Sequence, residues 1–318
     1  MRRLTFALLV LVLVISAACA EQGGGDPAAA PPDGGDELIV QPANYDLVAG
    51  EESRFIVGLL TADQLFVSFG DVGIEFFYLG TREGEGTAEE GPTATGAFLA
   101  IDAPADAAPQ GPAAVPGSEG RGVYAADVTF DRAGFWAAQV TAALEEGPIT
   151  GRGVFEVLEE HRYPAVGEPA PRTDNLTLAS TDAPLEAVDS RARAGEPVPD
   201  KSLHQVTIAD AIRRREPALV VFSTPVYCVS RFCGPVTDVV HDLQNDYGDR
   251  ANFIHIEVWR DFQNTVVNKG AAEWIYRGDD LTEPWVYLIG ADGKIDARWD
   301  NVATRSEIEP LLKELPVL

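Results

Sequence analysis

Apolar residues have a different spacing in each half of this chain. Between residues 38 and 158, short runs rich in Val, Ile, Phe and Tyr are separated by clusters of Gly, Pro, Asp and Asn. Runs of this kind, regularly spaced, predict an all-β sandwich over residues 38–159. The predicted strands span residues 38–40, 53–60, 66–69, 74–79, 97–101, 122–130, 134–144 and 151–158.

Two stretches interrupt these predicted strands. Residues 82–95 are acidic and rich in Gly, and residues 102–119 are rich in Ala and Pro. Neither stretch offers many side chains to a core, so both are predicted to be long loops.

The second half alternates between the two periodicities. Residues 207–215, 233–247, 268–277 and 306–315 have helical spacing, whereas residues 204–206, 218–223, 252–259, 285–289 and 295–299 are strand-like. The last two strands flank an Asp-Gly turn at Asp292, which predicts a hairpin. This alternation predicts an α/β domain over residues 201–318, with a central sheet covered by helices on both faces. Residues 160–200 lose periodicity and are rich in Pro, so they are predicted to be an interdomain linker.

The N-terminus has the features of an export signal. Arg2 and Arg3 precede an apolar run over residues 4–15, and small residues then lead to Cys19. This pattern resembles the lipobox of bacterial lipoproteins, which implies a signal peptide over residues 1–19 and lipidation of Cys19. Ser16 departs from the larger aliphatic residue usual in that motif, so ordinary cleavage and an uncleaved anchor remain alternatives.

Each of these alternatives exports the protein. Residues 20–37 are rich in Gly and Pro and are predicted to be a flexible linker. We therefore expect a protein anchored by a lipid to the outer face of the bacterial cell membrane.

Charge excludes one class of partner. The 318 residues carry a formal net charge of -26, spread without a long acidic block. A surface of this sign repels nucleic acids, so we expect none as a partner.

Cysteine usage narrows the candidate chemistry. The chain has three cysteines, and lipidation of Cys19 leaves only Cys228 and Cys233. Export places this pair where disulfides persist, and an isolated close pair suits redox cycling or metal binding. Residues five apart in a regular helix have Cα atoms roughly 8 to 9 Å apart, beyond the bridging limit of about 7 Å. A disulfide therefore requires either that Cys228 lies in a loop before the helix or that oxidation unwinds a helical turn.

Three motifs in residues 201–318 resemble the thioredoxin superfamily. The apolar residues 220–222 lead into the cysteine pair, and Pro284 directly precedes a strand. Residues 285–295, which end in Asp-Gly-Lys-Ile, are similar to a segment of exported thiol-disulfide oxidoreductases. The resemblance implies a thioredoxin-like fold, a cis bond before Pro284, and thiol-disulfide exchange without a cofactor. Its implied partners are thiols or disulfides of exported proteins, or a membrane redox partner.

The same resemblance implies roles for residues around the pair. Cys233 with the following Gly-Pro reproduces the start of the Cys-Gly-Pro-Cys motif, but Val236 stands in place of its second cysteine. Cys228 is therefore the expected partner and the expected attacking residue. Residues expected to line the substrate groove are Thr224, Pro225, Tyr227, Arg231, Glu283, Pro284 and Trp285.

Residues 123–141, with a turn at Gly134, resemble the late strands of small bacterial sandwich domains of exported proteins. This resemblance implies that residues 38–159 form an immunoglobulin-like domain with a structural or interaction role. The stretch has no cluster of Cys, His or Met, so copper ligands are not expected there.

Three other functions for the second half stay open at this point. The pair is equally compatible with a structural disulfide in a non-catalytic binding protein. Its spacing also resembles that of Q-type peroxiredoxins, although Thr224 stands four residues before Cys228 and not three. A copper site like that of Sco proteins is the third, with His241 or His255 as the candidate histidine.

Overall fold

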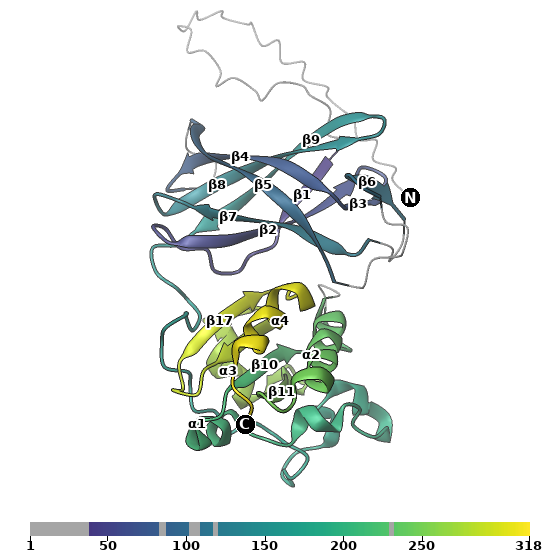
Figure 1. The fold of residues 1–318 in the computed structure, drawn as a ribbon, viewed down its shortest axis with the longest axis vertical. Coiled ribbons are helices and arrows are strands. Elements are labelled where there is room, and N and C mark those ends of the chain that lie inside the picture. The colour runs from purple at the N-terminus through teal and green to yellow at the C-terminus, as the bar shows by residue number, and fades with distance from the viewer. Residues whose placement is uncertain (1–37, 83–86, 102–108, 117–119, 229–231) are drawn as a thin grey trace, which may run out of the picture. The chain divides into compact units, whose positions relative to one another are not determined.

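Nine β-strands follow one another in the first half of the chain (Figure 1). The computed structural model describes residues 38–318 except 83–86, 102–108, 117–119 and 229–231. The strands are β1 (Leu38–Pro42), β2 (Glu52–Thr61), β3 (Phe66–Ser68), β4 (Asp71–Gly80), β5 (Glu89–Ala100), β6 (Ala113–Val115), β7 (Gly122–Thr129), β8 (Gly134–Leu144) and β9 (Gly147–Val157). Hydrogen bonds join them in one sheet of order β6-β3-β2-β7-β5-β4-β8-β9, with β1 beside β2. The predicted β-rich first half is confirmed.

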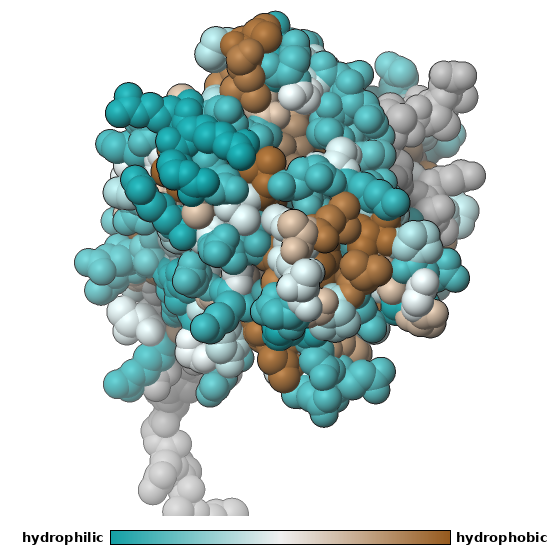
Figure 2. Space-filling view, turned by 90° about the horizontal axis from the view of Figure 1, so that it is seen from below, coloured by the Kyte–Doolittle hydropathy of each residue, from teal (hydrophilic) through white to brown (hydrophobic). Residues whose placement is uncertain are grey.

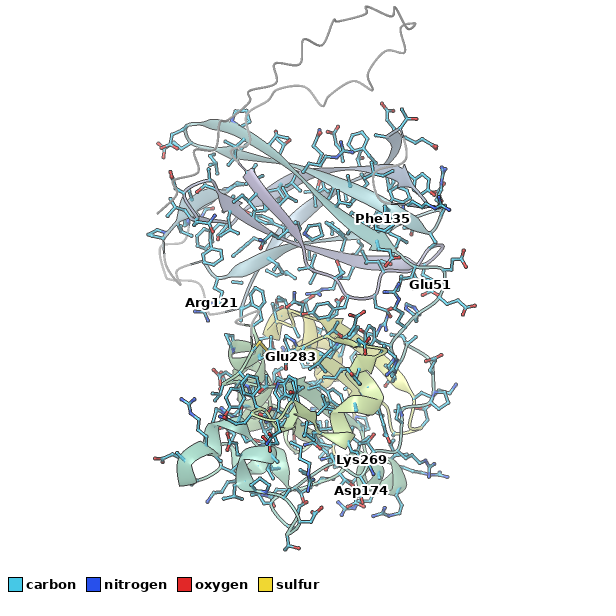
Figure 3. All side chains as sticks on the ribbon, turned by 180° about the vertical axis from the view of Figure 1, so that it is seen from behind. Glu51, Arg121, Phe135, Asp174, Lys269 and Glu283 are labelled. Carbon is cyan, nitrogen blue, oxygen red and sulfur yellow. A yellow bond between two sulfur atoms is a disulfide. The ribbon has the colours of Figure 1, made fainter. Side chains whose placement is uncertain are left out.

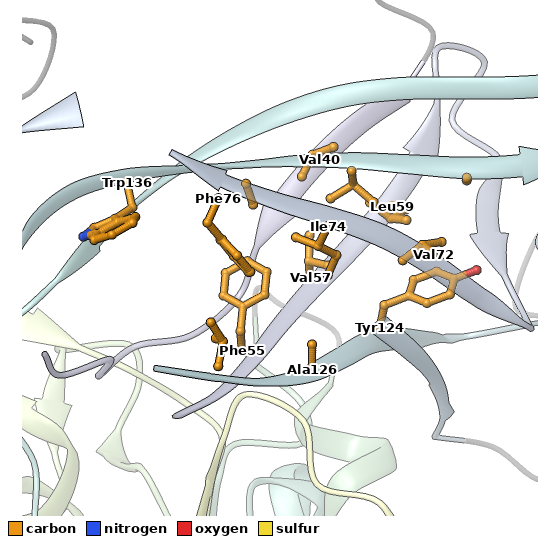
Figure 4. Packing of buried hydrophobic residues seen from close by; sticks show 14 of the residues in the cluster. Val40, Phe55, Val57, Leu59, Val72, Ile74, Phe76, Tyr124, Ala126 and Trp136 are labelled. Atoms are coloured by element: carbon orange, nitrogen blue, oxygen red, sulfur yellow. The ribbon is translucent and has the colours of Figure 1, made fainter. Parts of the chain in front are cut away.

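Alternating side chains give this sheet its core (Figure 4). Along β4, Val72, Ile74 and Phe76 are buried while the residues between them are exposed. Phe76 packs edge-on against Phe55 of β2, with ring centroids 5.0 Å apart. Tyr124 of β7 is also buried, and its hydroxyl donates a hydrogen bond to the carbonyl of Phe69 at 2.7 Å. The sheet thus encloses aromatic side chains, and the buried hydroxyl has a partner.

The prediction of two long loops is wrong in part. Strand β5 begins at Glu89, inside the predicted loop 82–95, and pairs with β4 and β7. Its side chains are mostly exposed or half-buried. Hydrogen bonds to two neighbouring strands therefore specify β5, and hydrophobic periodicity does not. The short strand β6 likewise falls inside the predicted loop 102–119.

One glycine marks a close approach of two strands. A Cβ atom added to Gly151 of β9 would lie 1.9 Å from the carbonyl oxygen of Leu38 in β1. We expect Gly151→Ala to lower the free energy of unfolding by about 1 to 3 kcal/mol, since the strands must separate to admit the methyl group. Urea denaturation measures this loss. Gly73→Ala is the matched control, because a Cβ atom there would meet nothing within 4 Å. Equal midpoints for the two variants would contradict the prediction.

The second half is built on a four-stranded sheet (Figure 1). Its order is β11-β10-β16-β17, with β10 parallel to β11 and antiparallel to β16. The strands are β10 (Ala218–Ser223), β11 (Asn252–Glu257), β16 (Trp285–Ile289) and β17 (Ile295–Asp300). Two short hairpins accompany the sheet, formed by β12 (Trp259–Asp261) with β13 (Val266–Val267) and by β14 (Tyr276–Arg277) with β15 (Asp280–Leu281).

Helices cover both faces of this sheet. Alternate residues of β10 enter different cores: Val220 and Phe222 pack with α1 (Ile208–Arg214) and α3 (Lys269–Ile275). Leu219 and Val221 pack with α2 (Cys233–Tyr247) and α4 (Arg305–Glu314). All six residues of β10 are buried, as expected for a central strand between two helical layers.

The strand predicted at residues 204–206 is absent, which corrects that prediction. The chain there forms the 3-10 helix η3 (Lys201–His204), which buries Leu203 against the α2 side of the sheet. Two further 3-10 helices, η1 (Leu185–Ala187) and η2 (Ser190–Gly195), lie within the Pro-rich residues 160–200. This stretch is attached to the second sheet, since Gly167 donates a backbone hydrogen bond to Ile295 at 2.8 Å.

The predicted signal peptide 1–19, Cys19 and the linker 20–37 lie outside the described residues. Within the described ranges, no helix is long and apolar enough to cross a membrane.

Candidate functional site: a disulfide at the start of α2

Cys228 and Cys233 form a disulfide between the end of β10 and the start of α2. Cys233 is the first residue of α2, whereas Cys228 lies in the preceding turn, where its amide donates a hydrogen bond to the carbonyl of Thr224 at 3.1 Å. The two Cα atoms are 6.1 Å apart. The alternative with Cys228 in a loop is therefore confirmed, and α2 keeps its first turn.

The two sulfur-bearing residues differ in exposure. Cys233 is 0% exposed, and Cys228 is half-buried. The carbonyl of Cys233 accepts a hydrogen bond from the hydroxyl of Thr237 at 2.7 Å, and this hydroxyl lies 2.6 Å from that of Ser223. Cys228 is therefore the more exposed of the two residues, while Cys233 is buried at the first turn of α2.

Glu283, labelled in Figure 3, lies near the disulfide in the loop between β15 and β16. A carboxylate oxygen of Glu283 lies within 4.8 Å of both sulfur atoms. The peptide bond from Glu283 to Pro284 is cis, which confirms the expectation for Pro284. The hydroxyl of Tyr45 donates a hydrogen bond to the carbonyl of Glu283 at 2.7 Å.

Burial changes the acidity of Glu283. Burial, together with the nearby carboxylate of Glu257, raises the pKa of this carboxyl to about 8. Its Oε2 atom is buried and makes no hydrogen bond. At neutral pH, Glu283 therefore carries a proton beside the disulfide, within reach of a newly formed thiolate.

Glu257 is a second buried acid in this region. It is 1% exposed at the end of β11, and it accepts a hydrogen bond from the amide of Ser190 at 2.8 Å. Desolvation raises its pKa. Sequence reasoning missed Glu257, although a charged residue within an otherwise apolar strand was a signal available to it.

Tyr227, the residue before Cys228, lines a pocket of about 390 Å³ together with Trp259 and Phe262. The ring of Tyr227 stacks on Phe262 with centroids 4.0 Å apart, and Trp259 meets Phe262 edge-on. The hydroxyl of Tyr227 donates a hydrogen bond to Glu186. Phe262 is 40% exposed, and the face drawn in Figure 2 has hydrophobic side chains grouped among hydrophilic ones. Sequence reasoning identified Tyr227 here, but not Trp259 or Phe262.

The residues predicted to line the substrate groove differ in exposure. Pro225, Tyr227 and Glu283 are half-buried, as is Cys228. The others are buried or outside the described residues: Thr224, Pro284 and Trp285 are buried, and Arg231 is not described.

Trp285 belongs to the core and does not line a groove beside the disulfide. Its ring is 1% exposed and stacks on Tyr287 at 5.5 Å. On the other side, it packs against Tyr45 at 5.9 Å and Tyr163 at 5.0 Å.

The histidines of the copper hypothesis lie elsewhere. The metal-ligating side chains that converge on the two cysteines include Glu283 and no histidine among the described residues. His255 Nε2 donates a hydrogen bond to the carbonyl of Ser223 at 3.1 Å, and His241 Nδ1 lies 3.5 Å from Asp200. A site with two thiolates and either histidine is therefore not formed in this conformation.

No protein-family model, curated protein or solved structure matches this chain.

Proposed function

We propose that this protein performs thiol-disulfide exchange on exported proteins through Cys228 and Cys233. The observation that carries the proposal is the disulfide itself, with one half-buried and one fully buried cysteine beside Glu283, whose pKa is raised to about 8. A bond used only to join two segments does not need this asymmetry or a proton donor.

The arrangement of elements supports a thioredoxin-like fold for residues 201–318. Strand β10 is central, α2 begins directly after the pair, and the cis bond before Pro284 precedes β16. We also propose an immunoglobulin-like relationship for residues 38–159, supported by an antiparallel sheet that encloses its own core. Its role would be to present the second half to partners.

The site supports a balanced two-step reaction. A thiolate of a reduced partner attacks Cys228 Sγ, the Cys228–Cys233 bond breaks, and its electron pair stays on Cys233, which takes a proton from Glu283. A second thiolate of the partner then attacks the partner's sulfur in the mixed disulfide, and Cys228 leaves as a thiolate. Two electrons have passed from the partner to the pair, and the reverse steps reduce a partner disulfide.

Location and partners follow from the N-terminal pattern. We propose export and lipid anchoring at the outer face of a bacterial cell membrane, where a disulfide persists. Partners would be exported thiols or disulfides, or a membrane redox protein that resets the pair. The aromatic pocket at Tyr227 and Phe262 supports binding of an apolar segment of a partner chain next to Cys228.

Redox titration with thiol trapping tests this function. We expect a reduction potential for the pair above about -300 mV, together with catalysed oxidation of a reduced test protein. The Cys228→Ser variant should lose the catalysis. A potential below this value and no catalysis would instead identify a structural disulfide in a binding protein.

A further inference from the structure

Three polar side chains from separate segments meet in the interior of the second half, apart from the disulfide. Asp189 is the N-cap residue of η2, His204 ends η3, and His255 lies in β11. Their exposed fractions are 0%, 1% and 0%. Buried groups of this kind are stable only when each polar atom has a partner.

Three of the four nitrogens of the two imidazoles lack such partners. His204 Nε2 lies 3.3 Å from Asp189 Oδ2, and His255 Nδ1 lies 3.5 Å from the same oxygen. Neither contact is a hydrogen bond, and His204 Nδ1 also makes none. Three buried ring nitrogens thus make no hydrogen bond, and two of them lie close to one carboxylate oxygen.

The tautomer of His255 leaves its Nδ1 as an acceptor. Its Nε2 lies 3.1 Å from the carbonyl oxygen of Ser223, which only accepts hydrogen bonds, so Nε2 carries the hydrogen. In the neutral ring, Nδ1 then presents a lone pair to Asp189 Oδ2, which is itself an acceptor. Two acceptors face each other across 3.5 Å, and a cation between them turns this repulsion into attraction.

The two nitrogen-to-oxygen distances match those between ligands of a tetrahedral metal ion. Zinc binds histidine nitrogen at about 2.0 to 2.1 Å and carboxylate oxygen at about 2.0 to 2.2 Å, which places neighbouring ligand atoms about 3.3 to 3.5 Å apart. The two nitrogen-to-oxygen distances are 3.3 and 3.5 Å, and all three ligand atoms lie within 4.8 Å of one another.

The surroundings also resemble the outer shell of a metal site. The hydrogen bond from His255 to Ser223 fixes the ring, and Asp189 Oδ1 accepts from the amide and Nε of Arg191 at 2.9 and 3.0 Å. Arg191 Nη2 also donates to Asp189 Oδ2 at 2.8 Å. Arg191 also forms an ion pair with Asp200 at 2.8 Å, which balances the positive charge of its guanidinium beside the cluster.

We propose that Asp189, His204 and His255 bind one divalent transition-metal ion, with zinc the best match in geometry. The ion would join residues 189–204 to β11 and would have a structural role. Sequence spacing gives no sign of this cluster, because its members come from segments far apart in the chain.

Zinc titration of the full exported chain tests the proposal. The protein is kept oxidised, stripped with a chelator, and titrated with Zn²⁺ while metal content and thermal midpoint are measured. We expect one tightly held equivalent per chain and a rise in the midpoint, because an ion that binds only the folded state stabilises it. His204→Gln and Asp189→Asn should each lose the stoichiometric ion.

Two controls separate this cluster from other ligands. His241→Gln removes a partly exposed histidine near Asp200, and the double variant Cys228→Ser/Cys233→Ser removes both thiols. Both should retain one equivalent. Loss of the ion from the double variant, or its retention by folded His204→Gln, would overturn the proposal.

Cobalt provides a readout that needs no variant. In the wild-type chain, Co²⁺ at this cluster should give the visible bands of a tetrahedral ion without the ultraviolet charge-transfer band of a thiolate. A wild-type chain that binds neither Zn²⁺ nor Co²⁺ stoichiometrically would show that Asp189 and the two histidines form a metal-free polar cluster.

Discussion

A Cys233→Ser variant is expected to accumulate a mixed disulfide through Cys228, whereas Cys228→Ser should not. Cys228 is half-buried and can attack a partner disulfide, and without Cys233 no second thiol releases the partner. In the reciprocal variant the remaining sulfur belongs to Cys233, which is 0% exposed. Non-reducing gels and intact mass after incubation with an oxidised test protein measure the trapped species.

The pair of variants is its own control, because each removes one sulfur and leaves the other. Equal trapping by both variants would show that α2 opens enough to expose Cys233. Trapping by Cys228→Ser alone would assign the attack to Cys233. Either outcome would contradict the order of steps proposed above.

Glu283→Gln is expected to slow reduction of the disulfide by about 10²-fold at pH 7, the low end of general acid catalysis because a thiolate is already a fair leaving group. Glutamine has nearly the same shape as glutamic acid but supplies no acidic proton to the sulfur of Cys233. Stopped-flow reduction by dithiothreitol, with rates divided by the concentration of its thiolate, measures the effect.

The rate of reduction should also depend on pH in the wild type. The pKa of Glu283 is raised to about 8, so the normalised rate of the wild type should be high below this pH and fall as pH rises through it. Glu283→Gln should be flat over the same range, and Glu283→Asp should restore part of the rate. A wild-type profile that matches that of Glu283→Gln would exclude the carboxyl as proton donor.

Stability provides a second readout of the same group. A carboxyl whose pKa is raised on folding favours the folded state below its unfolded pKa, and this contribution is lost as pH rises through about 8. As pH rises from about 4.5 to about 8, the free energy of unfolding of the wild type should therefore fall relative to that of Glu283→Gln. Urea midpoints at several pH values follow this difference.

Local patterns in the sequence predicted the elements that carry strong periodicity. The bounds of α2 were predicted at both ends, because Gly-Pro suits the first turn and apolar side chains repeat along the helix. The hairpin of β16 and β17 followed from its Asp-Gly turn. The reach of a disulfide left two alternatives, and the structure has the one in which Cys228 lies before the helix.

Other features depend on contacts between distant segments, which a single sequence does not encode locally. Strand β5 is defined by its two neighbours, and η3 replaced a predicted strand because Leu203 packs against the sheet. The raised pKa of Glu283 depends on burial and on Glu257, which lies in β11. The sequence therefore indicated the cysteine pair but not the protonation of the carboxyl beside it.

The packing of residues 160–200 decides where this chain can be cut. Ser190 in this stretch donates its amide to the buried Glu257, and Asp189 lies beside His255 in β11. A fragment that starts at residue 201 would leave both side chains of β11 without these neighbours. Expression of the second half by itself should therefore begin no later than residue 160, so that it includes the segment predicted to be a linker.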